Sequence, residues 1–186
     1  ELEIVSEIDG SQAVIHLAGE PLAKGRWSRK KKSKLLDSRV RTTQMIANSI
    51  KHAGLKPKVL INASAVGYYG PRESEWLQEE TRSGGDYLAQ VCQAWESHAV
   101  RIEDFDVRVV RLRIGIVLGK EGGALSMMAP VFKMGLGGWL GSGDQWMSWI
   151  HIDDLVRLII FCLDQSSVKG AINAVSPQPV TNKVFS

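Results

Sequence analysis

The sequence predicts an α/β protein with a doubly wound, parallel central sheet. Three short apolar segments, residues 13–19, 58–70 and 106–119, each end in small residues and glycine. Two segments with the apolar spacing of helices, beginning near Ser28 and Asp86, separate them. This alternation is typical of right-handed β-α-β units. We therefore expect the ends of the strands to share one edge of the sheet, where such folds place their sites.

Residues 58–70, Lys-Val-Leu-Ile-Asn-Ala-Ser-Ala-Val-Gly-Tyr-Tyr-Gly, are the segment around which we expect the site. A buried strand there gives way to hydroxyl groups and glycines. Ser64, Tyr68 and Tyr69 are the first hydroxyls that could point into a crevice at the sheet edge. The alternative is a plain strand-to-turn exit, in which the glycines supply positive φ angles.

The last third of the chain differs in composition. Half of the chain's 18 glycines lie within residues 115–143, which suits mobile loops around a substrate pocket. Along this part we expect an apolar helix at residues 124–133, a short strand at 146–152, a helix at 154–163 capped by Asp153, and a final strand at 171–176.

Composition bounds the class of protein. The 186 residues suit one domain, and a net charge of +3 is too small to imply a polyanionic partner. The Lys- and Arg-rich residues 24–34 could contact phosphate, but such a run is usually a solvated face, so we disfavour nucleic acid. No apolar run is long enough to span a membrane. Cys92 and Cys162 are isolated in apolar surroundings, which favours buried, reduced thiols and a cytoplasmic protein.

Several chemistries lack their motifs. The four histidines are far apart, with neither HExxH nor CxxC, so we expect no metal site. Ser64 does not stand in a G-x-S-x-G hydrolase motif, and the glycine-rich segment holds no P-loop. What remains is a hydroxyl pair, Ser64 with a tyrosine, that could polarise a carbonyl or alcohol during hydride transfer.

Four motifs in order carry a family resemblance. They are Val-Ile-His-Leu-Ala-Gly at 14–19, Ser-Ala-Val-Gly-Tyr-Tyr-Gly at 64–70, Val-Val-Arg-Leu-Arg-Ile-Gly-Ile-Val-Leu-Gly at 109–119, and Trp-Ile-His-Ile-Asp-Asp-Leu at 149–155. The chain resembles the short-chain dehydrogenase/reductase superfamily, in its extended or atypical epimerase-like subgroup, often labelled nucleoside-diphosphate-sugar epimerase or cell-division-inhibitor-like.

The resemblance implies a Rossmann-like fold that binds NAD(P), with a preference for NADP(H). It also implies a fragment that lacks the first β-α-β unit and the C-terminal end. Residues 1–119 would then be an incomplete NAD(P)-binding domain. Residues 120–186 would hold substrate-binding elements and a core strand that returns to the sheet. A plastid would suit such a protein as well as a bacterial cytoplasm.

The family also implies roles for particular residues. Those near the adenosine half of the cofactor would be Leu17, Ala18 and Gly19; those on the nicotinamide side would be Asn62, Ala63 and Ser64, followed by Arg113, Ile114 and Gly115. Ser64 would be the superfamily's catalytic serine.

The chain departs from the family at the Tyr-x-x-x-Lys pair. If Glu96 is the glutamate that commonly follows this pair, Leu88 and Cys92 occupy the tyrosine and lysine positions. A shift by one residue offers Tyr87, but Val91 then replaces the lysine. A tyrosine without that cation has a pKa of about 10 and is a poor acid or base at neutral pH.

Two functions stay open from the sequence. The first is an epimerase-like oxidoreductase acting on a nucleotide-sugar or another small carbonyl or alcohol, with Tyr68, Tyr69 or Tyr87 in place of the usual tyrosine. The second is a catalytically silent NAD(P)-binding protein with a structural or regulatory role, in which the tyrosines only line the crevice. The partner we expect is a small-molecule substrate, with no membrane; a homodimer is compatible with these features.

Overall fold

A four-stranded parallel sheet forms the centre of the computed structural model, which describes residues 6–22 and 25–186. Residues 1–5 of the predicted first domain and Lys24 of the basic run lie outside the described residues. The strands stand in the order β1 (Ala13–His16), β2 (Val59–Ala65), β3 (Arg108–Ile114) and β7 (Gly170–Ala174). The predicted parallel sheet is therefore confirmed, and the segment after residue 120 returns a strand to it.

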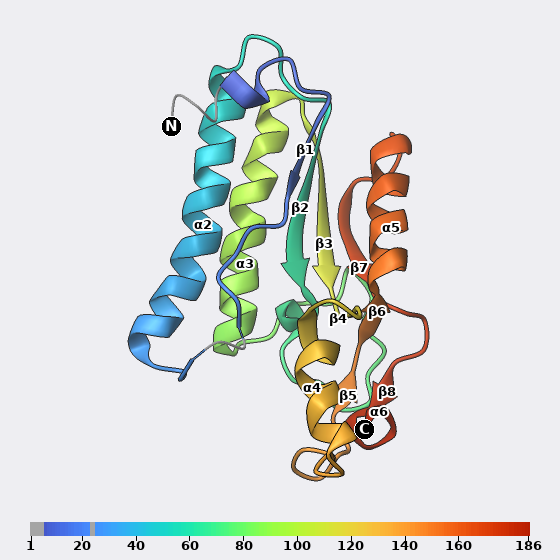
Figure 1. Ribbon diagram of the computed structural model, residues 1–186. Coiled ribbons are helices and arrows are strands. Elements are labelled where there is room, and N and C mark those ends of the chain that lie inside the picture. The colour runs from blue at the N-terminus through green and yellow to red at the C-terminus, as the bar shows by residue number, and fades with distance from the viewer. Residues whose placement is uncertain (1–5, 23–24) are drawn as a thin grey trace.

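Helices cover both faces of this sheet, as a doubly wound fold requires (Figure 1). Helices α2 (Arg29–His52) and α3 (Tyr87–Val100) lie on one face, and α5 (Ile152–Asp164) lies on the other. Because successive strand residues point to opposite faces, Leu60 packs with the α2 and α3 side chains while Ile61 packs with those of α5. Two apolar clusters thus hold the helices to the sheet.

Polar side chains cap the three long helices. Ser28 and Asp86 accept hydrogen bonds from the backbone N–H groups of Lys31 and Ala89, so the predicted helix starts are confirmed. The predicted cap of α5 is wrong. His151 caps this helix by accepting from the N–H of Asp153, because its ring nitrogen reaches that group at 3.2 Å.

The predicted strand at residues 106–119 breaks at Gly115. Beyond it, β4 (Ile116–Leu118) pairs with β6 (Trp149–His151) in a separate sheet. The break lies where the chain passes close to Ser148: a Cβ on Gly115 would lie 2.6 Å from the Ser148 carbonyl oxygen. The predicted strand at 146–152 is also divided, because β5 (Trp146–Met147) pairs instead with β8 (Val180–Thr181).

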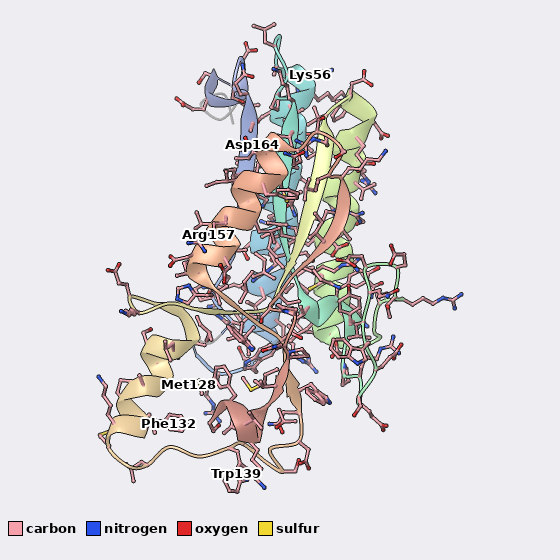
Figure 2. All side chains as sticks on the ribbon, turned by 90° about the vertical axis from the view of Figure 1, so that its right-hand side faces the viewer. Lys56, Met128, Phe132, Trp139, Arg157 and Asp164 are labelled. Atoms are coloured by element: carbon pink, nitrogen blue, oxygen red, sulfur yellow. The ribbon has the colours of Figure 1, made fainter. Side chains whose placement is uncertain are left out.

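The remaining elements gather beyond the carboxyl ends of the main strands (Figure 1). They are the 3₁₀ turn η1 (Val66–Tyr69), helix α4 (Gly123–Lys133) and the short helix α6 (Asn182–Phe185), while a second 3₁₀ turn, η2 (Arg101–Phe105), follows α3. Figure 2 shows Met128 and Phe132 on α4, where both line a small hollow shared with Phe185 of α6. The domain boundary predicted at residue 119 stays a prediction.

Candidate functional site

A cavity of about 910 Å³ lies at the carboxyl edge of the main sheet. Three segments form most of its wall, residues 69–77, 144–146 and 175–179, together with Asn173 of β7. The first of these belongs to the polar loop after β2, and the last follows β7 directly. The edge at which the sequence places the site therefore holds a cavity large enough for a small organic molecule.

Tyr69 is one of the hydroxyl-bearing residues that line the cavity, with Ser74, Ser148 and Ser176. Its side chain is buried, its hydroxyl donates to Asn173 Oδ1 at 2.6 Å, and Arg113 Nη1 donates to the same oxygen at 2.9 Å. Burial raises the pKa of Tyr69, and the hydrogen bond and charge of Arg113 oppose that shift. Tyr69 is therefore a neutral donor beside the cavity, with a cation placed to stabilise its oxygen.

Ser64 belongs to a buried ionic cluster under the same edge. Its hydroxyl donates to Glu96 Oε1 at 2.7 Å, and Arg113 donates to both oxygens of that carboxylate, at 2.9 and 3.0 Å. Arg111 Nη1 adds a third cationic contact at 3.3 Å. Although burial lowers it, the bonds to Glu96 and Tyr69 raise the pKa of Arg113 above its ordinary value. The proton of Ser64 is thus committed to Glu96.

Arg113 also holds the loop of residues 71–85 over the sheet. Its Nη1 donates to the Glu79 carbonyl at 2.8 Å. The Glu79 side chain accepts from the backbone N–H of Asn173 at 2.8 Å, and Asn173 Nδ2 donates to the Leu77 carbonyl at 3.1 Å. One arginine therefore connects the Ser64 cluster to the cavity wall.

The two other candidate tyrosines lie differently. The Arg113 guanidinium stacks on Tyr68, with its carbon 3.5 Å from the ring centroid, and Tyr68 packs edge-on against Tyr69. Tyr87 instead donates its hydroxyl to the Lys32 carbonyl of α2 and lies edge-on to Trp27. The structure thus brings Tyr68 and Tyr69 together at Arg113 and turns Tyr87 toward α2.

Leu88 and Cys92 face the end of β2. A Cβ placed on Gly67 would lie 3.7 Å from Leu88 Cβ and 3.9 Å from Cys92 Sγ. Burial, reinforced by the charge of Glu96, raises the pKa of Cys92 to about 11. A neutral thiol thus lies beside the turn that follows β2, and the choice between the two alignments of the Tyr-x-x-x-Lys pair stays a prediction.

The end of β1 has an accessible backbone. Leu17, Ala18 and Gly19 are exposed, so a ligand could approach their backbone closely. The Arg39 guanidinium packs under Gly19, with its carbon 3.2 Å from where a Cβ would lie. The guanidinium also donates to the backbone carbonyls of Glu20 and Leu35, so it fixes this segment of backbone in place.

The predicted nicotinamide-side residues are mostly enclosed. Asn62 is fully buried, and its Oδ1 has no hydrogen-bond partner among the described residues, so an acceptor is left over at this edge. Ala63 is buried, and Ile114 packs in the apolar cluster on the α5 face. Gly115 is explained by its approach to Ser148.

Sequence reasoning missed Asn173 and Glu79 as site residues and used Glu96 only to align the family motif. The sequence does contain one signal that an acidic partner lies near this strand. Arg111 and Arg113 alternate with apolar residues within the strand that begins at Arg108, and a buried arginine requires a partner. Which acid supplies that partner depends on the packing of α3 against the sheet, which the sequence pattern does not specify.

Two absences hold for the part of the chain that the structure describes. Within residues 6–22 and 25–186, no three His, Cys, Asp or Glu side chains are grouped so that they could hold a metal ion. In the same ranges, no helix has the length and apolar character needed to cross a membrane.

Comparison with known proteins identifies the family. The model of the NAD dependent epimerase/dehydratase family matches residues 1–174. The chain belongs to this family. It is 50% identical over 175 residues to the chloroplastic epimerase family protein SDR39U1 homolog of Arabidopsis thaliana, covering 93% of this chain and 50% of that protein. The chain thus spans about half the length of this curated relative.

Solved structures in the family have the same fold. The human epimerase family protein SDR39U1, isoform 2, with NADPH is 34% identical with a TM-score of 0.93, over 98% of this chain and 63% of that one. A nucleoside-diphosphate sugar epimerase from Corynebacterium glutamicum is 35% identical with a TM-score of 0.84, over 97% of this chain and 38% of that one. The Rossmann-like fold and the epimerase-like resemblance are therefore confirmed.

Proposed function

We propose that the full-length protein containing this chain binds NAD(P), with a preference for NADP(H), and transfers hydride to or from a small carbonyl or alcohol. The observation that carries the proposal is the cavity of about 910 Å³ with Tyr69 among its lining residues and Arg113 bonded to the Tyr69 hydroxyl. Family membership and the human relative's structure with NADPH support the choice of cofactor.

The cofactor would lie along the carboxyl edge of the sheet. The exposed backbone of Leu17, Ala18 and Gly19, with Arg39 behind it, would hold the adenosine half. On the nicotinamide side, Asn62, Ala63 and Ser64 would support the cofactor from beneath, since all three are buried. When bound, the cofactor would supply or accept the hydride.

Tyr69 is the residue that we propose as the proton donor. Tyr69 lines the cavity, and its hydroxyl donates to Asn173 and accepts from Arg113. A substrate would have to replace Asn173 as the acceptor of this proton. A positioned cation stabilises the charge that develops when a tyrosine gives up its proton. Ser64 acts through Glu96 and Arg113, so it is a positioning residue in this scheme.

Calorimetric titration of the full-length protein with NADPH and NADH tests the cofactor. We expect NADPH to bind at least about tenfold more tightly, equivalent to about 1.4 kcal/mol. Reduction of 9,10-phenanthrenequinone, followed by NADPH absorbance, then tests the chemistry. Tyr69→Phe should lower kcat without weakening the binding of NADPH, whereas the control Tyr87→Phe should leave kcat unchanged. Failure of both nucleotides to bind would refute the proposal.

A second function is favoured by Leu88 and Cys92, which stand where the family's tyrosine and lysine would be if Glu96 is the family's glutamate. A cofactor-binding protein without catalysis would bind NADPH and reduce no carbonyl probe. In that case the Tyr69→Phe variant would match the wild type in every readout except stability.

The compartment and the assembly belong to the same proposal. We propose that the protein functions in a bacterial cytoplasm or in a plastid. The relative from Arabidopsis thaliana is named as a chloroplastic protein. A homodimer stays a prediction, which sedimentation of the full-length protein would test.

A further inference from the structure

The cavity wall is rich in apolar rings. Trp76 and Trp146 both line it, and Trp146 Nε1 donates to Ser74 Oγ at 3.4 Å, which joins the loop after β2 to β5. Pro71, Pro177 and Pro179 add rigid apolar surface. Rings and prolines of this kind favour a ligand with an apolar ring system of its own.

The charges of the wall are mostly negative. Glu73, Glu75 and Asp144 line the cavity, whereas Arg72 is its one lining cation among the described residues. The structure shows no ion pair for the carboxylates of Glu73 and Asp144 within those residues. The wall therefore carries two carboxylates in excess.

Arg72 is already engaged. Its Nη1 lies 3.6 Å from Glu75 Oε2, its Nε donates to the Tyr69 carbonyl at 3.3 Å, and its Nη2 donates to the Arg82 carbonyl at 3.1 Å. The deeper cation, Arg113, is bonded to Glu96, Tyr69 and Glu79. Diphosphates are usually recognised by unengaged arginines, lysines or helix N-termini, whereas both of these arginines are already bonded within the part of the chain that the structure describes.

We propose that the substrate of this cavity carries an apolar ring and is neutral or positively charged rather than anionic. The two excess carboxylates disfavour an anionic group, while two tryptophans and the same carboxylates suit a ring or an organic cation. This inference rests on the proposed function only in taking the cavity as the substrate site.

Three probes test the inference on the full-length protein, each with and without NADPH. They are 1-indanone as a neutral ring ketone, benzyltrimethylammonium as a ring-bearing cation, and UDP-glucose. By calorimetry we expect both ring probes to bind, and UDP-glucose to bind the NADPH-loaded protein more weakly than either of them or not at all. Trp146→Ala should lower the affinity for both ring probes at least about fivefold, because it removes an aromatic side chain from the cavity wall.

Charge removal separates the two ring probes. The double variant Glu73→Gln/Asp144→Asn should lower the affinity for benzyltrimethylammonium about two- to fivefold, since exposed charges act weakly. It should leave the affinity for 1-indanone within about twofold of the wild type. The control Glu80→Gln/Asp104→Asn, which lies outside the cavity wall, should change neither.

Each outcome decides the inference. It is overturned if neither ring probe binds, if Trp146→Ala leaves their affinity intact, or if UDP-glucose binds more tightly than both and loses affinity in Trp146→Ala. If the ring probes behave as expected but NADPH does not bind, the cavity inference stands and the proposed cofactor fails.

Discussion

The Ser64 hydroxyl donates a 2.7 Å hydrogen bond to Glu96 Oε1, joining the end of β2 to the middle of α3. The same carboxylate forms ion pairs with Arg111 and Arg113 of β3. One buried acid thus ties together two neighbouring strands and the helix that covers them. Since Arg113 continues to Tyr69 and Glu79, the position of the cavity wall depends on this acid.

Ser64→Ala should destabilise the protein by about 1.5–3 kcal/mol, the usual loss for a buried hydrogen bond to a charged group. Glu96 would keep both arginines, which limits the loss. Urea unfolding gives the free energy. The control Ser97→Ala, whose exposed hydroxyl donates to a backbone carbonyl of its own helix, should change it by less than about 0.5 kcal/mol. Equal stability of the two variants would contradict a role for the Ser64 bond.

Arg113→Lys should loosen the loop of residues 71–85. Lysine keeps the charge but cannot make the fork to Glu96 while also reaching Tyr69 and the Glu79 carbonyl. We expect the Gly84 amide, which donates to the Tyr68 carbonyl, to exchange with deuterium at least about tenfold faster, equivalent to about 1.4 kcal/mol of local stability.

Arg157→Lys is the matched control for this exchange experiment, since Arg157 forms an exposed pair with Asp154. It should leave the exchange of Gly84 unchanged. If Arg113→Lys also leaves that exchange unchanged, the loop is held by its other contacts, among them the bonds of Asn173 to Glu79 and Leu77.

The parts of the fold that depend on neighbouring residues could be predicted from the sequence. Ser28 and Asp86 predict where their helices begin, because a cap needs only its own side chain and the backbone of the next helical turn. The parallel strands follow from apolar runs separated by helices.

The contacts that make the site could not be predicted in the same way. Tyr69 and Asn173 are 104 residues apart, and their bond depends on β7 returning beside β3. The break at Gly115 likewise depends on the close passage of Ser148. Such contacts are set by tertiary packing. Sequence periodicity and local propensity carry no information about them.

His16 should make stability depend on pH. Burial lowers the pKa of His16 from 6.5 to about 4, so the folded protein favours the neutral ring. Between these values the unfolded chain binds more protons than the folded one. The stabilisation is therefore complete above about pH 6.5 and is lost as the pH falls toward 4, by about 2–3 kcal/mol.

Urea unfolding at pH 7 and pH 4.5 measures this dependence. His16→Gln should reduce the difference between the two pH values, and the control His52→Gln, an exposed residue at the end of α2, should leave it as in the wild type. Identical pH dependence in the wild type and His16→Gln would assign the effect to other groups.

Cys92 should be inert in the folded protein. Its pKa of about 11, raised by burial and by Glu96, leaves little thiolate at pH 8, and the side chain is enclosed between Gly67 and α3. In the Cys162→Ser background, which isolates this thiol, we expect labelling by iodoacetamide at least about a hundredfold slower than at an exposed cysteine. Ser97→Cys in the same background provides that exposed thiol, and unfolding in guanidinium should bring both to the same rate. Fast labelling of folded Cys92 would mean that the contact between η1 and α3 opens, and it would make this thiol, rather than Tyr69, the group to examine first for reactivity at the sheet edge.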